Sequence, residues 1–374
     1  MKNLNKSYDA GLMLAPVTIT PTKPLTPTHV KGLLWLDVMY RSTRQVVRTD
    51  LMWNPRAAHL TTQSTAFWAF LDRHLPGTRW EELSEQELGE IYVRSHTETR
   101  PTVAELLPYL RRVDEEGWIH PASIRLLQLW RRQLALLNVE DPGLLRDRPL
   151  TMSADEAVAL LADQDLLIDH RRFGGPVYVD GPRWGLPLRQ LAGPDGLVNY
   201  LLPILRDLLP HAARGDRILL VHDAELTQDY VLLDRILTVA GGEVTRLSLG
   251  RVPIDGVIVS SRHGGWQGAT LERLSATCLE QVDLPTYRLG MRLYFVGALK
   301  RSSPQSFDPE LLRRSLQRAA KVIDRVGADG DPCDDFLRDL LGKPGYVDPY
   351  RLTTSLTARH RTVPVADLLN RVYL

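Results

Sequence analysis

The stretch Thr20-Pro-Thr-Lys-Pro-Leu-Thr-Pro-Thr-His29 decides how the rest of this chain is interpreted. It lies between two apolar runs, 12–19 (LMLAPVTI) and 30–36 (VKGLLWL), which predict a buried strand before it and a helix after it. The first N–H groups of a helix have no partner within the helix, and the helix dipole is positive at that end. A loop that leads into such a helix start therefore suits the phosphates of a nucleotide.

A second motif, Ser260-Ser-Arg-His-Gly264, lies far downstream, after a segment 256–260 (GVIVS) that predicts a last short strand. It offers two hydroxyls, the fixed cation of Arg262 and a flexible glycine, which suit a mobile loop that closes over pyrophosphate. The two motifs together predict an ATP site. An ordinary polar turn after a strand is the alternative for the second motif.

Composition limits the class of protein. The chain has 374 residues, of which 44% are apolar and 24% charged, and its net charge is +1. A net charge close to zero argues against a large surface that binds nucleic acid. The two cysteines are too few for a disulfide framework, and no cysteine–histidine cluster has metal-ligand spacing. No apolar run reaches the roughly 20 residues of a membrane span, and no signal peptide is visible. We expect a cytoplasmic protein.

The order of expected elements is that of an α/β fold with a doubly wound parallel sheet. The chain opens with a strand over 12–19, a helix over 30–44 and a strand over 45–51, and it is strongly helical over 61–162. Further strands are expected at 176–179, 217–222 and 256–260, further helices at 197–209, 231–240 and beyond 309, and a loop or linker at 327–350.

With these two motifs in this order, the chain resembles the catalytic core of class I aminoacyl-tRNA synthetases, and specifically that of arginyl-tRNA synthetase. The lead-in of that family's first motif is intact as Pro21-Thr-Lys-Pro-Leu25. The His-x-Gly-His signature itself becomes Thr26-Pro-Thr-His29, so only the second histidine is kept. The second motif matches as Val259-Ser-Ser-Arg-His-Gly264, with Ile258 where many relatives carry lysine. Asp37, Arg41 and the Asp195-Gly196…Tyr200 segment also fit, and the register can be followed over about residues 12–310.

The resemblance implies a Rossmann-like (HUP-type) catalytic domain at 12–300 with a helical insertion at about 61–175. It also implies a reduced helical C-terminal region at 301–374, and we expect a flexible N-terminus at 1–11. We expect the family's RNA-contacting N-terminal domain and its large anticodon-binding domain to be missing or reduced.

The resemblance further implies ATP and Mg²⁺ as cofactors, with no metal site made by the protein alone. The reaction would be attack of an amino-acid carboxylate on the α-phosphorus of ATP. The implied catalytic residues are His29, Lys23 and Arg262, and the implied ATP-binding residues are Thr26, Thr28, His29, Ser260, Ser261, Arg262, Gly264, His222 and Asp223. Plain structural interpretations stand beside these: Lys23 as a solvated lysine in a loop, and His222 and Asp223 as solvent-facing residues of the loop after a strand.

For the amino-acid pocket the candidates are Thr20, Asp50, Trp53, Asn54, Tyr200, Ile204 and Leu226, with Trp53 alternatively part of the core. Family members hold arginine with an asparagine, an aspartate and a glutamine at the positions of Thr20, Ile204 and Leu226. Because a buried guanidinium needs polar partners, the substrate is expected to be a smaller or more apolar amino acid.

The leading hypothesis is a tRNA-independent, adenylate-forming amino-acid ligase of a biosynthetic pathway. Its acceptor would be a small molecule or a carrier protein, with no membrane partner. Two alternatives remain: an aminoacyl-transfer enzyme that uses tRNA, and a non-catalytic synthetase-like protein that binds ATP or an amino acid.

Overall fold

In the computed structural model, which describes residues 11–258, 263–266, 268–325, 331–358 and 363–374, the central element is a parallel sheet of four strands. Its order is β2-β1-β6-β7, with β1 in the middle paired to both β2 and β6. The strands are β1 (Leu12–Pro16), β2 (Thr49–Leu51), β6 (Arg217–Asp223) and β7 (Glu243–Leu249). The predicted α/β class with a parallel sheet is confirmed.

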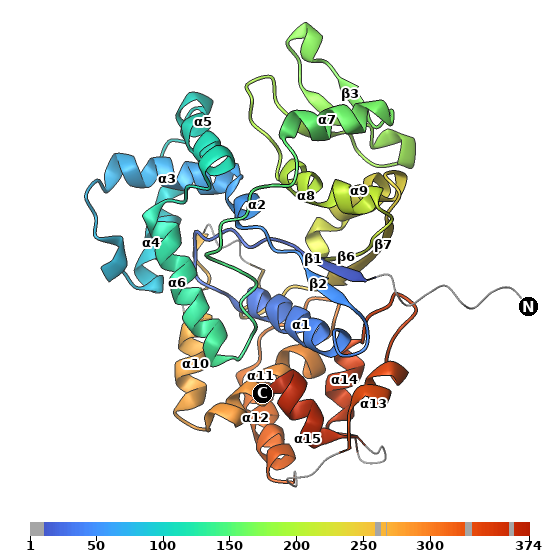
Figure 1. The fold of residues 1–374 in the computed structure, drawn as a ribbon. Helices are drawn as coiled ribbons and strands as arrows, with labels where there is room; N and C mark the ends of the chain where they lie inside the picture. Colours follow the sequence, from blue (N-terminus) through green and yellow to red (C-terminus); the bar gives the residue numbers. More distant parts are fainter. Residues whose placement is uncertain (1–10, 259–262, 267, 326–330, 359–362) are drawn as a thin grey trace, which may run out of the picture.

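Helices cover both faces of this sheet (Figure 1). Along β1 the side chains alternate, so Leu12 and Leu14 pack with α1 (Pro27–Thr43), while Met13 and Ala15 pack on the opposite face. On that second face lie α8 (Leu201–Ala213) and α9 (Thr227–Val239). The sheet is therefore buried on both sides, as a doubly wound fold requires.

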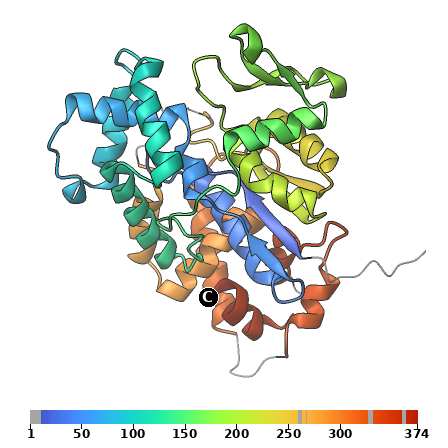
Figure 2. The same cartoon turned by 45° about the horizontal axis from the view of Figure 1, so that its top comes forward.

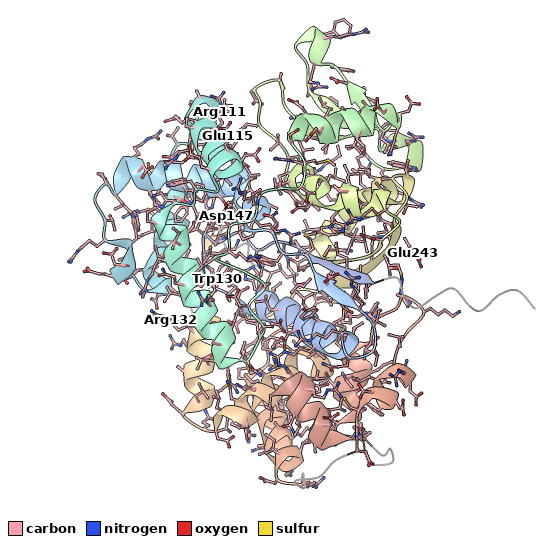
Figure 3. The ribbon with its side chains drawn as sticks, viewed as in Figure 1. Arg111, Glu115, Trp130, Arg132, Asp147 and Glu243 are labelled. Atoms are coloured by element: carbon pink, nitrogen blue, oxygen red, sulfur yellow. The ribbon has the colours of Figure 1, made fainter. Side chains whose placement is uncertain are left out.

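The region between β2 and α7 is a helical insertion with its own core (Figure 2). Large aromatic side chains such as Trp68 and Phe67 fill this core. Arg111 on α5 and Arg132 on α6 lie on exposed faces of their helices (Figure 3). The helices are α2 (Pro55–His59), α3 (Thr62–His74), α4 (Glu85–Ser95), α5 (Val103–Arg111) and α6 (Pro121–Leu136).

Two arginines hold the insertion in place, one through a pair within the insertion and the other through a pair between the insertion and α8. Arg56 on α2 donates to both carboxylate oxygens of Asp147, at 2.7 Å each, and Asp147 lies between α6 and α7 (Figure 3). Arg206 on α8 donates to both oxygens of Asp114 at 2.8 Å. Bidentate pairs of this kind fix orientation as well as distance.

After α6 the chain forms α7 (Ala154–Asp163) and a small antiparallel sheet. Ser153 and Glu156 make a capping box at the start of α7. The predicted strand at 176–179 exists as β4 (Val177–Val179), but it belongs to this small sheet with β3 (Leu167–Asp169) and β5 (Arg189–Ala192). It does not extend the central sheet.

The helices after β7 pack against one another and against α1. Val38 of α1 and Leu289 of α11 share a core with residues as distant as Val372 and Tyr373. The helices are α10 (Leu271–Leu279), α11 (Leu284–Arg292), α12 (Pro309–Ile323), α13 (Asp334–Asp339), α14 (Pro349–Ser355) and α15 (Val365–Leu368). The proposed domain boundary at residue 300 remains a prediction, and residues 1–10 lie outside the described part of the chain.

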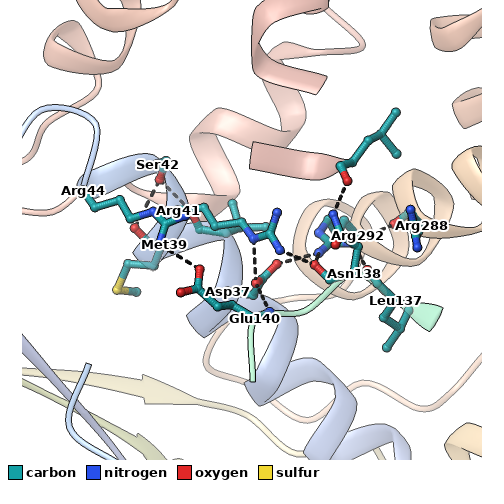
Figure 4. A network of polar contacts seen from close by, with 12 residues as sticks. Asp37, Met39, Arg41, Ser42, Arg44, Leu137, Asn138, Glu140, Arg288 and Arg292 are labelled. Atoms are coloured by element: carbon teal, nitrogen blue, oxygen red, sulfur yellow. Dashed lines mark hydrogen bonds and ion pairs between the residues drawn. The ribbon is translucent and has the colours of Figure 1, made fainter. Parts of the chain in front are cut away.

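Buried charges connect this C-terminal region to α1 (Figure 4). Arg292 is fully buried and its Nη2 donates to Asp37 Oδ2 at 2.5 Å and to the carbonyl of Asn138 at 3.2 Å. Arg41 donates to the other Asp37 oxygen at 3.0 Å. Asn138 in turn donates through Nδ2 to the carbonyl of Leu374, the last residue. One network thus joins α1, the end of α6, α11 and the C-terminus.

Three expectations about the elements were wrong. The fourth strand of the central sheet is β7, which was not expected, whereas described residues 256–258 form a turn closed by a single bridge between Ile254 and Val257. Strand β2 is shorter than the predicted 45–51. The predicted loop at 327–350 contains α13, because Leu337 packs into the core there. Among the described residues, no helix is long and apolar enough to cross a membrane.

Candidate functional site

A cavity of about 340 Å³ lies at the carboxyl ends of β1, β6 and β7. The end of β1 at Pro16, the end of β6 at His222 and Asp223, and Leu249 of β7 all line it. The loop 17–26 and the first turn of α1 form a second side. In open α/β sheets ligands bind outside the carboxyl ends of the strands, so this cavity is the candidate site.

His29 is held by the helix start that it helps to form. The backbone N–H of Thr26 donates to His29 Nδ1 at 3.1 Å, and the Thr26 side chain caps the first turn in return. Burial, reinforced by the charges of Lys23 and Arg251, lowers the pKa of His29 to about 3. The ring is therefore neutral, and because Nδ1 accepts, its proton must be on Nε2. His29 can thus act on a ligand in the cavity as a hydrogen-bond donor.

Two cations line the same cavity. Lys23 lies in the loop before α1, with its Nζ 5.7 Å from the centre of the Tyr92 ring. Arg251 lies two residues after the end of β7 and pairs with Glu225 at 2.5 Å. Asp223 supplies the opposing charge; burial raises its pKa, while Arg251 lowers it. A polyanion entering from the α1 side would meet both cations.

The loop after β7 is clamped onto α1. Lys31, only 1% exposed, donates from Nζ to the carbonyls of Gly250 at 2.8 Å, Lys300 at 2.6 Å and Arg301 at 3.1 Å. Its burial lowers its pKa to about 8, with Asp223 acting in the opposite direction. These bonds fix the position from which Arg251 faces the cavity.

His222 presents a free acceptor at the end of β6. It is 1% exposed and stacks on Tyr230, with ring centroids 4.5 Å apart. Its Nδ1 donates to the carbonyl of Asp223 at 2.9 Å, and burial lowers its pKa. The neutral ring therefore carries a lone pair on Nε2, which has no partner among the described residues.

The helical insertion forms a further wall of the cavity. Gln63 on α3 donates to Tyr92 on α4 at 2.9 Å and to Thr22 at 3.2 Å, and both Gln63 and Tyr92 line the cavity. Trp266, 2% exposed, also lines it and packs against α4 where the helix carries Gly89. The insertion is thus part of the site.

A second, smaller cavity of about 30 Å³ adjoins the first, since Pro16 and Thr18 line both. Its walls are largely apolar and come from β1, β6, α2 and α8. Polar side chains on it include Asn54, the N-cap of α2, and Asp207, which is 2% exposed on α8. Tyr230, the stacking partner of His222, lines it as well.

The structure brings together most of the residues predicted for the site. The main cavity is lined by Lys23, Thr26, Thr28, His29, His222, Asp223 and Gly264 among the ATP candidates, and by Thr20, Trp53 and Leu226 among the amino-acid candidates. Asn54 and Ile204 line the smaller cavity. Ser260, Ser261 and Arg262 lie outside the described residues. The functional roles of all these residues stay predictions.

Two predicted pocket residues are placed elsewhere. Asp50 is paired in register with Met13, well before the end of β1, and it lines a separate open groove with Glu140 and His211. Tyr200 donates its hydroxyl to Asp229 at 2.5 Å and lines neither of the two cavities.

The hydroxyls of Thr26 and Thr28 are already engaged within the protein. Thr26 Oγ1 lies 3.1 Å from His29 Nδ1, and Thr28 Oγ1 accepts from the N–H of Val252 at 3.0 Å. Both threonines stabilise the cavity wall through these bonds.

Sequence reasoning missed Arg251, Gln63, Tyr92, Trp266 and Asp207. Arg251 lies two residues after the end of a strand, and recognition of β7 would have placed it at the ligand edge of the sheet. Gln63 and Tyr92 lie on insertion helices whose packing has no local signal in the sequence. Among the described residues, no group of three or more His, Cys, Asp or Glu side chains could hold a metal ion.

Comparisons with known proteins identify the fold. No protein-family model and no curated protein sequence matches this chain. Its structure is similar to the arginyl-tRNA synthetase of Thermus thermophilus, with a TM-score of 0.60 and 15% sequence identity, over 97% of this chain and 79% of that one. It is also similar to a protein from Campylobacter jejuni assigned as an arginyl-tRNA synthetase, with a TM-score of 0.53 and 13% identity, over 97% and 83%.

The chain therefore has the fold of the arginyl-tRNA synthetases, as the resemblance of its motifs predicted. Because 97% of this chain is covered, the match extends into the helices that follow residue 301.

Proposed function

We propose that this protein activates an amino acid with ATP, forming an aminoacyl-adenylate and pyrophosphate. The observation that carries the proposal is the placement of His29. Its Nε2–H is available at the first turn of α1, in a cavity at the carboxyl ends of the strands with Lys23 and Arg251 on its walls. The synthetase fold supports the same reading.

In this reaction a carboxylate oxygen of the amino acid attacks the α-phosphorus of ATP. The bond from that phosphorus to the bridging oxygen breaks, and its electron pair leaves with pyrophosphate. The protein has to align the two reactants and stabilise the charge that develops on the phosphates. His29 donates a hydrogen bond to a phosphate oxygen, and Lys23 and Arg251 balance the negative charge of the departing pyrophosphate.

Magnesium is expected to arrive with ATP. Mg²⁺ is held mainly by waters and substrate phosphates with one or two carboxylates, and Asp223 on the cavity wall fits that requirement. When bound, it would supply positive charge that neutralises the phosphates. His222 offers its Nε2 lone pair to a hydroxyl or ammonium group of a substrate.

The substrate is proposed to be an amino acid other than arginine. Ile204 and Leu226, which line the two cavities, offer no hydrogen bond to a guanidinium. Thr20 provides one hydroxyl at the mouth. Asp207 offers a carboxylate, but it lies on a cavity of about 30 Å³, which is too small for a guanidinium. An arginine side chain would therefore remain without polar partners, and its desolvation would cost several kcal/mol.

The proposed acceptor is a small molecule or a carrier protein. A net charge of +1 provides little long-range attraction for a polyanion. A tRNA acceptor is the second candidate, and one observation favours it: the likeness to two proteins named as tRNA synthetases includes the C-terminal helices.

The proposal is tested by ATP–pyrophosphate exchange with each common amino acid, first without RNA and then with total tRNA. We expect exchange with one non-arginine amino acid and no RNA. His29→Ala should lower the exchange rate about 10²-fold, the loss typical of removing one charge-stabilising donor. His74→Ala, which changes an exposed histidine, is the matched control.

The other outcomes support different functions for this protein. Exchange that requires tRNA supports the tRNA-using enzyme. ATP binding without exchange supports the non-catalytic protein. If His29→Ala kept the wild-type exchange rate, His29 would not take part in the reaction, and the proposed site would be wrong.

A further inference from the structure

The small cavity beside the ATP cavity carries two polar atoms without partners. Asn54 is 3% exposed, and its Oδ1 accepts from the N–H of Arg56 at 2.9 Å. That bond fixes the orientation of the amide, so Nδ2 is the donor left over. Nδ2 has no hydrogen-bond partner among the described residues.

Asp207 shows the complementary pattern. Its Oδ1 accepts from the N–H of Thr151 and from the Thr151 hydroxyl, each at 3.2 Å. Its Oδ2 has no hydrogen-bond partner within the described residues. Burial raises the pKa of this carboxyl, while Thr151 and the nearby Asn54 amide lower it. The Asn54 amide is close enough to lower the pKa of Asp207 as a hydrogen bond would, but Asn54 Nδ2 and Asp207 Oδ2 do not meet hydrogen-bond geometry with each other.

An unpaired buried donor beside an unpaired buried acceptor is costly unless something bridges them. The rest of the wall is largely apolar, formed by side chains such as Ala15, Met52 and Leu208. A volume of about 30 Å³ accommodates a group of about one or two non-hydrogen atoms. The group that fits must therefore be small and must both donate and accept a hydrogen bond.

A hydroxyl meets both conditions, because its O–H can donate to Asp207 while its lone pair accepts from Asn54. An ammonium group has no lone pair for the Asn54 donor, and a methyl group leaves both atoms unpaired. A guanidinium or a carboxamide exceeds the volume.

The small cavity also lies where the side chain of a bound substrate could enter it. Pro16 and Thr18 line both cavities, and Ile204, one helical turn before Asp207 on α8, lines the small one. We propose that the cavity between Asn54 and Asp207 binds the side chain of the substrate amino acid and selects a short side chain with a hydroxyl, as in serine or threonine. This inference rests on the proposed function and specifies its substrate.

The first test compares exchange with serine and threonine against alanine, 2,3-diaminopropionate, valine and asparagine. We expect kcat/KM for serine or threonine to exceed that for alanine at least about 10²-fold, since a site built to bond a hydroxyl rejects an analogue that lacks it. A preference for any amino acid without a hydroxyl would overturn the inference while leaving the proposed function intact. Absence of exchange with every amino acid tested would instead count against the proposed function.

The second test exchanges the donor and the acceptor. Asp207→Asn gives the site two amides, Asn54→Asp gives it two carboxyls, and each should lower the serine-to-alanine ratio at least about tenfold. The double variant Asn54→Asp/Asp207→Asn restores one donor and one acceptor in reverse order. Because a hydroxyl can bond in either direction, the double variant should recover most of the ratio.

If Asn54 and Asp207 only stabilise the fold, we expect a different result. In that case the single variants would lower the melting temperature without changing the serine-to-alanine ratio, and this result would overturn the inference. Thermal melting of each variant with and without serine separates the two effects. Asn54→Asp keeps the oxygen that caps α2, so this variant should remain folded.

Discussion

Glu85 shows how a single residue supports the motif loop. It is fully buried at the start of α4, and its carboxyl accepts from the backbone N–H of Leu25 at 3.1 Å and from Gln133 Nε2 at 2.8 Å. Burial raises the pKa of Glu85 to about 7, although these bonds act in the opposite direction. The loop that leads to His29 therefore rests on a carboxyl that is protonated in the folded protein at mildly acidic pH.

This residue predicts a pH dependence of stability. Below the unfolded pKa of about 4.5 the carboxyl is protonated in both states, so its contribution to stability is complete. As the pH rises from there through about 7, the unfolded state ionises first and stability is lost, by up to about 3 kcal/mol. Urea unfolding at pH 5 and pH 8 should show this loss, and Glu85→Gln should reduce it.

The matched control is Glu90→Gln, which changes an exposed carboxyl on the same helix and should keep the wild-type pH dependence. Equal pH dependence in Glu85→Gln and the wild-type protein would contradict the assignment.

Among the elements, α4 is the one whose close approach shapes the site. A Cβ atom at Gly89 would lie 2.4 Å from Trp266 Cη2 and 2.7 Å from Pro24 Cδ, far inside van der Waals contact. Pro24 belongs to the first motif, and Trp266 lines the main cavity. The absence of a side chain at Gly89 therefore lets the insertion contact both the first motif and Trp266.

Gly89→Ala tests this contact. Alanine favours a helix over glycine by about 1 kcal/mol, but the overpacking should cost about 1–3 kcal/mol. We expect a lower melting temperature and weaker ATP binding by calorimetry, because Trp266 must move. Glu90→Ala, on the exposed side of α4, should show neither effect. If Gly89→Ala raised the melting temperature and left the ATP affinity unchanged, Trp266 and Pro24 would be able to move without loss of stability or binding, which contradicts the prediction.

At the scale of the whole molecule, the buried Arg292–Asp37 pair connects α11 to α1 (Figure 4). Arg292→Met leaves Asp37 buried with only Arg41 as its charge partner. This should destabilise the protein by about 3–5 kcal/mol in denaturant unfolding. Arg44→Met, which breaks the exposed pair with Glu140, should cost about 0–1 kcal/mol.

The double variant Asp37→Leu/Arg292→Met distinguishes the loss of a partner from the loss of packing. Removing both charges should cost less than the sum of the single changes. Strict additivity would mean that the two side chains act independently.

The sequence predicted the opening strand, loop and helix because that signal is local: continuous apolar runs flank a proline-rich loop. It missed β7 because this strand lies at the edge of the sheet and alternates buried Leu247 and Leu249 with more exposed residues, so no apolar run marks it. Asp50 was wrongly placed at the pocket because β2 reaches only the level of Leu14 on β1. The cavity wall from the insertion arises from tertiary packing, which a single sequence does not encode locally.

One consequence of the first turn of α1 concerns how this protein can evolve. His29 stands at the third helical position, where glutamate and glutamine are the best partners for the capping Thr26. In a descendant that no longer needs catalysis, substitution of His29 by glutamate or glutamine would stabilise the start of α1. The same substitution would remove the hydrogen-bond donor from the cavity. Natural variation at position 29 should therefore separate lineages that still perform chemistry from those that retain the scaffold for another purpose.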